Sequence, residues 1–211
     1  MKTIKIALFV FAFFQCLDSL DAQDSTNIFI IAYSGVSHIQ APEDFQEQWN
    51  SGWNLGFAGG WQFNKFITAF CLYERHWFAV NGDEFRRQKG ILYIPSYDYL
   101  KGGGIHVTNT MSGLRFTAPI TKNQRGFFPF ITAQLGWSTT SDTKIQTYYG
   151  KYERGGYSDL SRAFSYGFEL RLNHYFNYLF EWKLLQPTDR KGTNLTLFHF
   201  GLIPNPVYKK K

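Results

Sequence analysis

The chain has 211 residues, enough for one domain with a sizeable core, and aromatic side chains make up 19% of it. Its mean hydropathy of -0.28 excludes a bundle of membrane-spanning helices, but not a barrel whose strands are apolar on one face only. The formal net charge of +6 is spread along the chain without a long basic block, so the composition does not indicate nucleic-acid binding.

The N-terminus has the pattern of a secretory signal peptide. Lys2 and Lys5 supply its positive charge, and the unbroken apolar run over residues 6–14 is too short to cross a bilayer as a helix. The small side chain of Ala22 fits a cleavage site, so we expect export and cleavage after this residue. The alternative is a lipid-modified Cys16.

The next segment predicts a strand and a short helix. Residues 27–39 are apolar enough for a first strand, but their alternation does not assign its two faces. Pro42, the acidic residues after it and Gly52 beyond Trp49 are typical of one or two helical turns in a connecting loop.

Residues 52–64 alternate with a strict period of two, which predicts a strand with two unlike faces. One face is almost entirely glycine, alanine and amide, which suits the crowded interior of a small closed barrel. The opposite face is then directed outward and requires lipid. Its members are Trp53, Leu55, Phe57, Trp61 and Phe63.

The rest of the chain continues this pattern to an even count of eight strands, with long connections alternating with short ones. An all-β, eight-stranded antiparallel up-and-down transmembrane β-barrel is therefore expected. The predicted strands cover residues 27–39, 52–64, 66–80, 105–118, 127–140, 161–173, 178–186 and 195–203. Their further lipid-facing residues are Ile131, Leu135, Trp137, Phe164, Tyr166, Phe168, Phe180, Trp182, Phe198 and Phe200.

The segment Pro42-x-x-Phe45-x-x-x-Trp49-x-x-Gly52, followed by the glycine-rich strand, resembles small outer-membrane β-barrel proteins of the Bacteroidota and related bacteria. The resemblance implies a fold and an outer-membrane location rather than an activity. The C-terminus departs from it, because prolines and a basic tail follow the last strand. The implied organisation is a signal peptide at 1–22, a barrel at 27–205 and a tail at 206–211.

Four charged residues are expected to face the lumen: Glu169, Arg171, Glu181 and Lys183. They lie on adjacent predicted strands, so we expect them to pair inside a filled barrel without an aqueous pore. The alternative is a gated proton or ion path. No spacing typical of a nucleophilic or metal-dependent enzyme occurs, so a non-enzymatic chain without cofactor or metal is expected.

The two longest predicted loops combine tyrosines with basic residues, a mixture that binding surfaces favour. We expect them either to bind an extracellular protein or glycan or to rest on lipopolysaccharide head groups, with the barrel as their anchor. Alternatives are a secreted or periplasmic lipocalin-like barrel for an apolar ligand and a lipid-modifying enzyme at the barrel rim. The expected contact residues are Arg86, Arg87, Tyr93, Tyr97, Tyr99, Tyr148, Tyr149 and Tyr152.

Overall fold

The computed structural model describes most of the chain between the expected signal peptide and the basic tail. The predictions for these two terminal segments, residues 1–22 and 206–211, therefore lie outside the described residues. The structure describes residues 28–41, 43–64, 66–91, 100–118, 126–172, 176–188 and 193–204.

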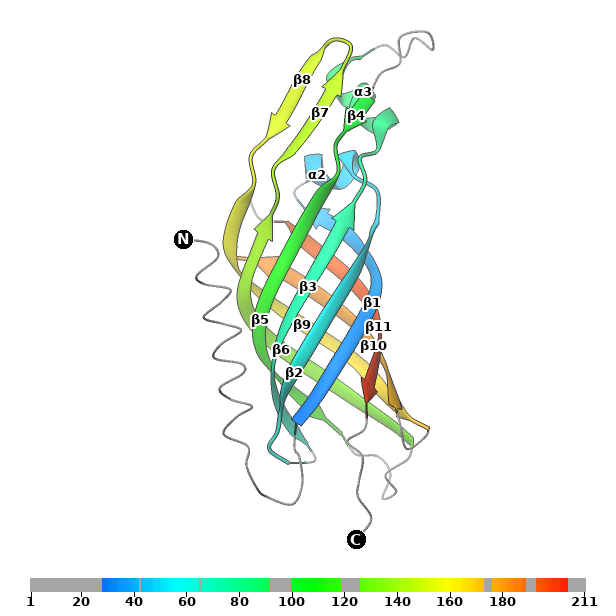
Figure 1. Ribbon diagram of the computed structural model, residues 1–211, viewed down its shortest axis with the longest axis vertical. Coiled ribbons are helices and arrows are strands. Elements are labelled where there is room, and N and C mark those ends of the chain that lie inside the picture. The colour runs from blue at the N-terminus through cyan, green and yellow to red at the C-terminus, as the bar shows by residue number, and fades with distance from the viewer. Residues whose placement is uncertain are drawn as a thin grey trace.

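Eight strands form a closed antiparallel barrel in the order β1-β11-β10-β9-β6-β5-β3-β2, and each strand pairs with its neighbours in the sequence of barrel strands (Figure 1). This confirms the predicted fold class. The barrel strands are β1 (Ile28–Ala41), β2 (Gly52–Gln62), β3 (Ile67–Phe78), β5 (Ile105–Thr117), β6 (Gly126–Thr140), β9 (Tyr157–Arg171), β10 (Phe176–Pro187) and β11 (Asn194–Pro204).

The strand register fixes the stagger of the barrel. Paired residues followed around the wall from Gln62 return to the same strand, β2, at Gly52, ten residues earlier (62 − 52). Eight strands with this stagger tilt by about 40° from the barrel axis and leave an interior that side chains fill. The intermediate partners are Thr68, Arg115, Thr132, Ser165, Lys183, Leu197 and Ser37.

Small inward residues make room for the large side chains that share the lumen. The ring of Tyr33 lies so close to Gly56 that a Cβ atom there would be only 2.4 Å from ring carbons. Alanine at this position would force the ring to move. The structure also assigns the faces that the sequence left open: Tyr33 on β1 and Phe70 and Leu72 on β3 are buried inside the barrel.

The long connections gather at one end of the barrel, which we call the loop end; the short connections lie at the turn end (Figure 1). The expected helix in the first connection is present as α2 (Glu43–Gln48). The predictions of loops over residues 81–104 and 141–160 are wrong in part, because these connections contain regular structure that extends the molecule beyond the barrel. These elements are α3 (Gly82–Lys89), β4 (Leu100–Gly102), β7 (Thr143–Thr147) and β8 (Gly150–Arg154), and β9 begins four residues before its predicted start.

The extension, defined as α2, α3 and the three-stranded sheet β4-β7-β8, has a small core of its own. Phe85 of α3 is 2% exposed, and its ring meets the ring of Tyr152 edge to face at 5.2 Å. The Trp49 indole Nε1 donates a hydrogen bond to the Gly103 carbonyl at 2.7 Å. These contacts place a packed apolar layer over the loop end. Neither described helix is long and apolar enough to span a membrane.

Candidate functional site

The lumen contains a polar cluster centred on Glu74 of β3. Lys183 Nζ donates to Glu74 Oε2 at 2.6 Å, and the Tyr33 hydroxyl donates to the same oxygen at 3.0 Å. Asn109 Nδ2 donates to the other carboxylate oxygen at 2.9 Å. The side chains of Glu74 and Lys183 are completely buried. The carboxylate therefore receives the charge and the hydrogen bonds that a buried anion requires.

Glu181 and His199 continue this cluster on β10 and β11. His199 Nδ1 lies 2.9 Å from Glu181 Oε2, and the Ser165 hydroxyl donates to the other oxygen of Glu181. The other ring nitrogen of His199 has no hydrogen-bond partner among the described residues and lies 4.0 Å from Glu74 Oε2. The imidazole thus lies between two carboxylates.

Ser37, His76 and Glu74 form a chain that resembles the nucleophile, base and acid of a hydrolase. Ser37 Oγ lies 2.7 Å from His76 Nδ1, and His76 Nε2 lies 3.5 Å from Glu74 Oε1. Catalysis by such a chain also requires a substrate beside the hydroxyl. All three residues are 0% exposed, and Asn54 Nδ2 donates to the Ser37 hydroxyl at 2.8 Å. The Ser37 hydroxyl is therefore buried and hydrogen-bonded on both sides in the described barrel.

A second cluster lies nearer the turn end, around Glu169. Arg171 Nε donates to Glu169 Oε1 at 2.8 Å, and Arg115 Nη1 lies 3.8 Å from Glu169 Oε2. The two guanidinium groups also lie over aromatic rings, Arg115 at 3.8 Å from the ring centre of Phe130 and Arg171 at 4.1 Å from that of Phe128. Cation–π contacts supplement the ion pairs here.

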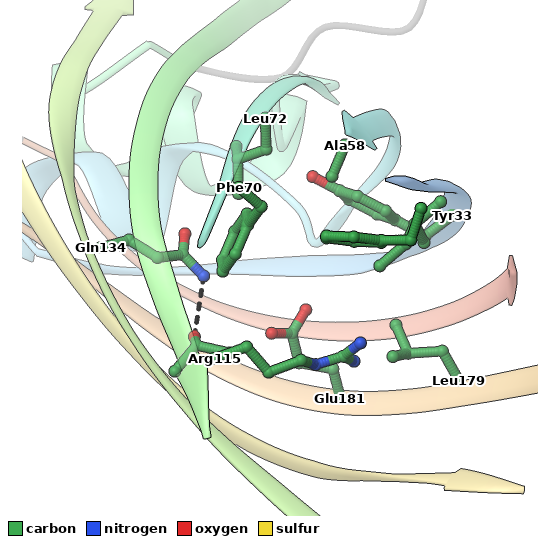
Figure 2. A pocket seen from close by; sticks show the side chains of 11 residues that line it. Tyr33, Ala58, Phe70, Leu72, Arg115, Gln134, Leu179 and Glu181 are labelled. Carbon is green, nitrogen blue, oxygen red and sulfur yellow. Dashed lines mark hydrogen bonds between the residues drawn. The ribbon is translucent and has the colours of Figure 1, made fainter. Parts of the chain in front are cut away.

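A small cavity separates the two clusters (Figure 2). Arg115 and Glu181 lie together on one side, Phe70 and Tyr33 lie on the other, and Gln134 extends beside Phe70. Its volume of about 20 Å³ has room for about one water molecule. The carbonyl oxygen of Gln134 is buried without a hydrogen-bond partner and would suit that water.

The four charges predicted to form one group are divided between these two clusters. Glu169 and Arg171 contact each other, whereas Lys183 pairs with Glu74 across the lumen and Glu181 pairs with His199. Glu74, the central partner, was not predicted to face the lumen because both faces of β3 carry apolar residues and leave its register open. Other lumen residues that the sequence interpretation missed are Tyr33, His76, Asn109 and Arg115. Within the described ranges, no three His, Cys, Asp or Glu side chains are placed to hold a metal ion.

The side chains predicted to face lipid point away from the lumen, and most are exposed. Phe168 and Trp182 are half-buried because neighbouring rings cover them: Phe168 stacks between Phe127 and Phe180 at 4.9 and 4.8 Å. A lipocalin-like barrel has the opposite arrangement, with large apolar groups inside. The structure therefore contradicts that alternative, and contact of these rings with lipid stays a prediction.

The predicted contact residues of the extension differ in availability. Arg86 and Arg87 form ion pairs with Asp83 at 3.0 Å and Glu84 at 2.5 Å. The hydrogen bond from Arg87 lowers the pKa of the Glu84 carboxyl below its ordinary value. Tyr152 is packed against α3. Tyr93, Tyr97 and Tyr99 lie outside the described residues.

Tyr148 and Tyr149 occupy the tip of the β7–β8 hairpin, where both are exposed. Their rings meet edge to face at 5.5 Å, so the tip presents two differently oriented aromatic faces. Just below it, Lys151 and Lys144 both pair with Glu153, and the hydrogen bond from Lys151, with the charges of the two lysines, lowers the pKa of the Glu153 carboxyl. The cations of this hairpin are thus partly neutralised.

Solved structures of known proteins identify the fold. Ail, the attachment invasion locus protein of Yersinia pestis, is similar with a TM-score of 0.53 and 10% identity, over 84% of this chain and 96% of Ail. Neisserial surface protein A is similar with a TM-score of 0.56 and 8% identity, over 85% of this chain and 97% of that protein. This is the fold of a small outer-membrane β-barrel.

The same comparisons give no finer assignment. No protein-family model and no curated protein matches the chain, so the expected Bacteroidota family is not supported. The outer-membrane enzyme PagL also matches, with 11% identity over 85% of this chain and 99% of PagL. Its TM-score of 0.43 is too low to argue for or against catalysis.

Proposed function

We propose that this chain is a non-enzymatic outer-membrane anchor that holds the extension at the cell surface. The observation that carries the proposal is the spacing of outward aromatic residues. Trp53 and Phe63 lie ten residues apart on and just after β2, and Phe127 and Trp137 lie ten apart on β6. Ten residues on strands tilted by about 40° span about 25 Å, the height of the apolar band of a membrane barrel.

The extension is the proposed contact surface. Long connections lie on the outer side of outer-membrane barrels, which places the extension outside the cell and the short turns in the periplasm. The exposed Tyr148 and Tyr149 at the hairpin tip are residues that binding surfaces favour. Because the described basic residues of the extension are largely paired with acids, an extracellular protein or an uncharged glycan fits better than a strongly anionic partner.

A structure of Ail holds the heparin analogue sucrose octasulfate, and it matches this chain with a TM-score of 0.50 and 12% identity, over 84% of this chain and 96% of Ail. This likeness supports the fold alone. The ion pairs of the present extension are a reason to expect weaker binding of sulfated sugars here. Export by a signal peptide cleaved after Ala22 is part of the proposal, because a barrel must cross the inner membrane to reach its site.

Cysteine labelling in intact cells tests the orientation. In a Cys71→Ser background, a membrane-impermeant maleimide should label Gln146→Cys, which is exposed on β7. The matched variant Ala118→Cys, exposed at the turn end, should react only after the outer membrane is permeabilised. Labelling of Ala118→Cys in intact cells, or no labelling of Gln146→Cys, would contradict the proposal. Altered migration of unheated samples on a gel verifies that each variant forms the barrel.

A further inference from the structure

The outer wall of the barrel has a polar region near the loop end. Arg75 on β3, Thr108 on β5, Thr139 on β6 and Ser158 on β9 occupy one row of paired residues, and all point outward. The Thr139 and Ser158 hydroxyls are hydrogen-bonded at 2.9 Å. By contrast, the corresponding stretch of β1 and β2 presents Val36, Trp53 and Leu55, which are exposed and apolar.

Two arginines lie at the edge of this region that is nearer the turn end. Arg75 lies two residues before Trp77, and Arg162 pairs with Leu135, two residues before Trp137. Two residues on a strand tilted by about 40° correspond to about 5 Å along the barrel axis. The Cα atoms of both arginines therefore lie about 5 Å closer to the bilayer centre than those of the tryptophans. Their long side chains can still place the guanidinium groups at the membrane surface.

Neither arginine has a carboxylate partner at ion-pair distance among the residues that the structure describes. The Arg75 guanidinium lies 5.5 Å from the ring centre of Trp77, and its Nε is buried without a hydrogen-bond partner. A cation on the lipid face of a barrel is destabilising, by an amount that decreases from the bilayer centre toward its surface. A counter-ion at the surface removes that penalty and supplies the missing hydrogen bonds.

We propose that Arg75 and Arg162 each bind a phosphate of a lipid head group in the outer leaflet, with Thr108 and Thr139 as hydroxyl donors on the two strands between them. Three strand spacings across the wall and four residues along β9, from Ser158 to Arg162, separate the two arginines by about 20 Å, so each takes its own phosphate. Arginine matches phosphate geometry with two parallel hydrogen bonds, which a head group without phosphate cannot accept in the same way. This inference rests on the proposed membrane location. It names phosphate as the lipid group that the outward-facing arginines bind.

Native mass spectrometry of the full barrel in neutral detergent tests the proposal, with phosphatidic acid as the probe. Diacylglycerol with the same acyl chains serves as the phosphate-free control. The barrel should retain phosphatidic acid over diacylglycerol, and the double variant Arg75→Gln/Arg162→Gln should lower that affinity about 30-fold. Arg75→Lys/Arg162→Lys keeps both charges and should lose less. The matched variant Lys144→Gln/Lys151→Gln removes the same charge from the extension and should bind like the wild type.

Equal retention of phosphatidic acid and diacylglycerol by the wild type would overturn this inference. So would an equal loss of phosphatidic acid affinity in Arg75→Gln/Arg162→Gln and in Lys144→Gln/Lys151→Gln. The proposed function fails in a different way. If the wild-type chain does not insert into phosphatidylcholine vesicles as a heat-modifiable barrel, the membrane location itself is wrong. If it inserts normally and the glutamine variant binds phosphatidic acid unchanged, only the phosphate sites are wrong.

Discussion

Glu74 and Lys183 join opposite sides of the barrel, because β3 and β10 are separated by three strands in either direction around the wall. Both side chains are fully buried, so neither charge can be solvated by water if the other is removed. A pair of this kind holds the lumen in one arrangement, but it contributes less to stability than its short distance suggests, because both charges had to leave water.

Replacing Lys183 by Met should lower the free energy of unfolding by about 3–5 kcal/mol, because the Glu74 carboxylate stays buried without its cation. Urea unfolding in vesicles, followed by tryptophan fluorescence, measures the change. The double variant Glu74→Gln/Lys183→Met should recover part of the loss, and the exposed Lys144→Met should change little. If the double variant loses as much unfolding free energy as Glu74→Gln and Lys183→Met lose in sum, the two residues are not coupled and the prediction is wrong.

At the same scale, alternation alone could assign Glu169 and Arg171 to the lumen, since every second residue around them is large and apolar. It could not assign Glu74 to the lumen, because both faces of β3 carry apolar residues and the charged Arg75 stands next to Glu74 on the opposite face. Nor does a single sequence indicate that Glu74 meets Lys183, 109 residues later, because that contact depends on how the sheet closes.

At the scale of an element, β2 shows how far a period of two determines orientation. Its large odd residues Trp53, Leu55, Phe57 and Trp61 are exposed on the outside of the barrel, as expected, and Asn54 and Ala58 are buried inside. The strand was predictable because its two faces differ in size as well as polarity.

Phe57 lies near the middle of the outward row of β2 and is 54% exposed. Phe57→Arg should therefore lower stability in a bilayer by about 2–4 kcal/mol, because the charge would sit near the bilayer centre. Urea titration of barrels folded into phosphatidylcholine vesicles gives the value. The matched control Tyr148→Arg, in the extension, should stay within about 0.5 kcal/mol of the wild type. Unchanged stability of the Phe57 variant would mean that this face does not meet lipid.

The first helix of the extension, α2, was expected, but α3 and the β7–β8 hairpin were missed for two different reasons. α3 carried readable signals: Asn81 caps its start by accepting a hydrogen bond from the Glu84 backbone, and Gly90 ends it with φ 62°. β7 and β8 are only five residues each, too short for a periodic pattern to be distinctive. The apolar residues that β7 and β8 pack against, such as Phe85, lie on other connections. No pattern within the two strands themselves therefore indicates this packing.

At the scale of the whole molecule, the described lumen is occupied along its length. The extension packs over the loop end, the Glu74–Lys183 pair crosses the lumen, the Glu169 cluster lies nearer the turn end, and the cavity between the two clusters has room for about one water. Ion conduction needs a continuous wet path, which these side chains interrupt.

Planar-bilayer recordings of the inserted barrel should therefore show no steady single-channel conductance. The same preparation must first show the altered gel migration of an unheated, folded barrel. An absence of current then cannot be attributed to failed insertion. Clear unitary currents would favour the gated ion path that the sequence left open and would contradict a filled lumen.

The hairpin tip is joined almost directly to the longest strand ladder of the wall. Only two residues separate β7 from β6 and β8 from β9, and β6 and β9 share a ladder that runs from Gly126 and Arg171 to Thr140 and Tyr157. A mechanical pull on Tyr148 and Tyr149 therefore acts along the strands rather than across them. The backbone hydrogen bonds from β6 to β5 and from β9 to β10 are then loaded in shear. They bear the force together instead of breaking one after another.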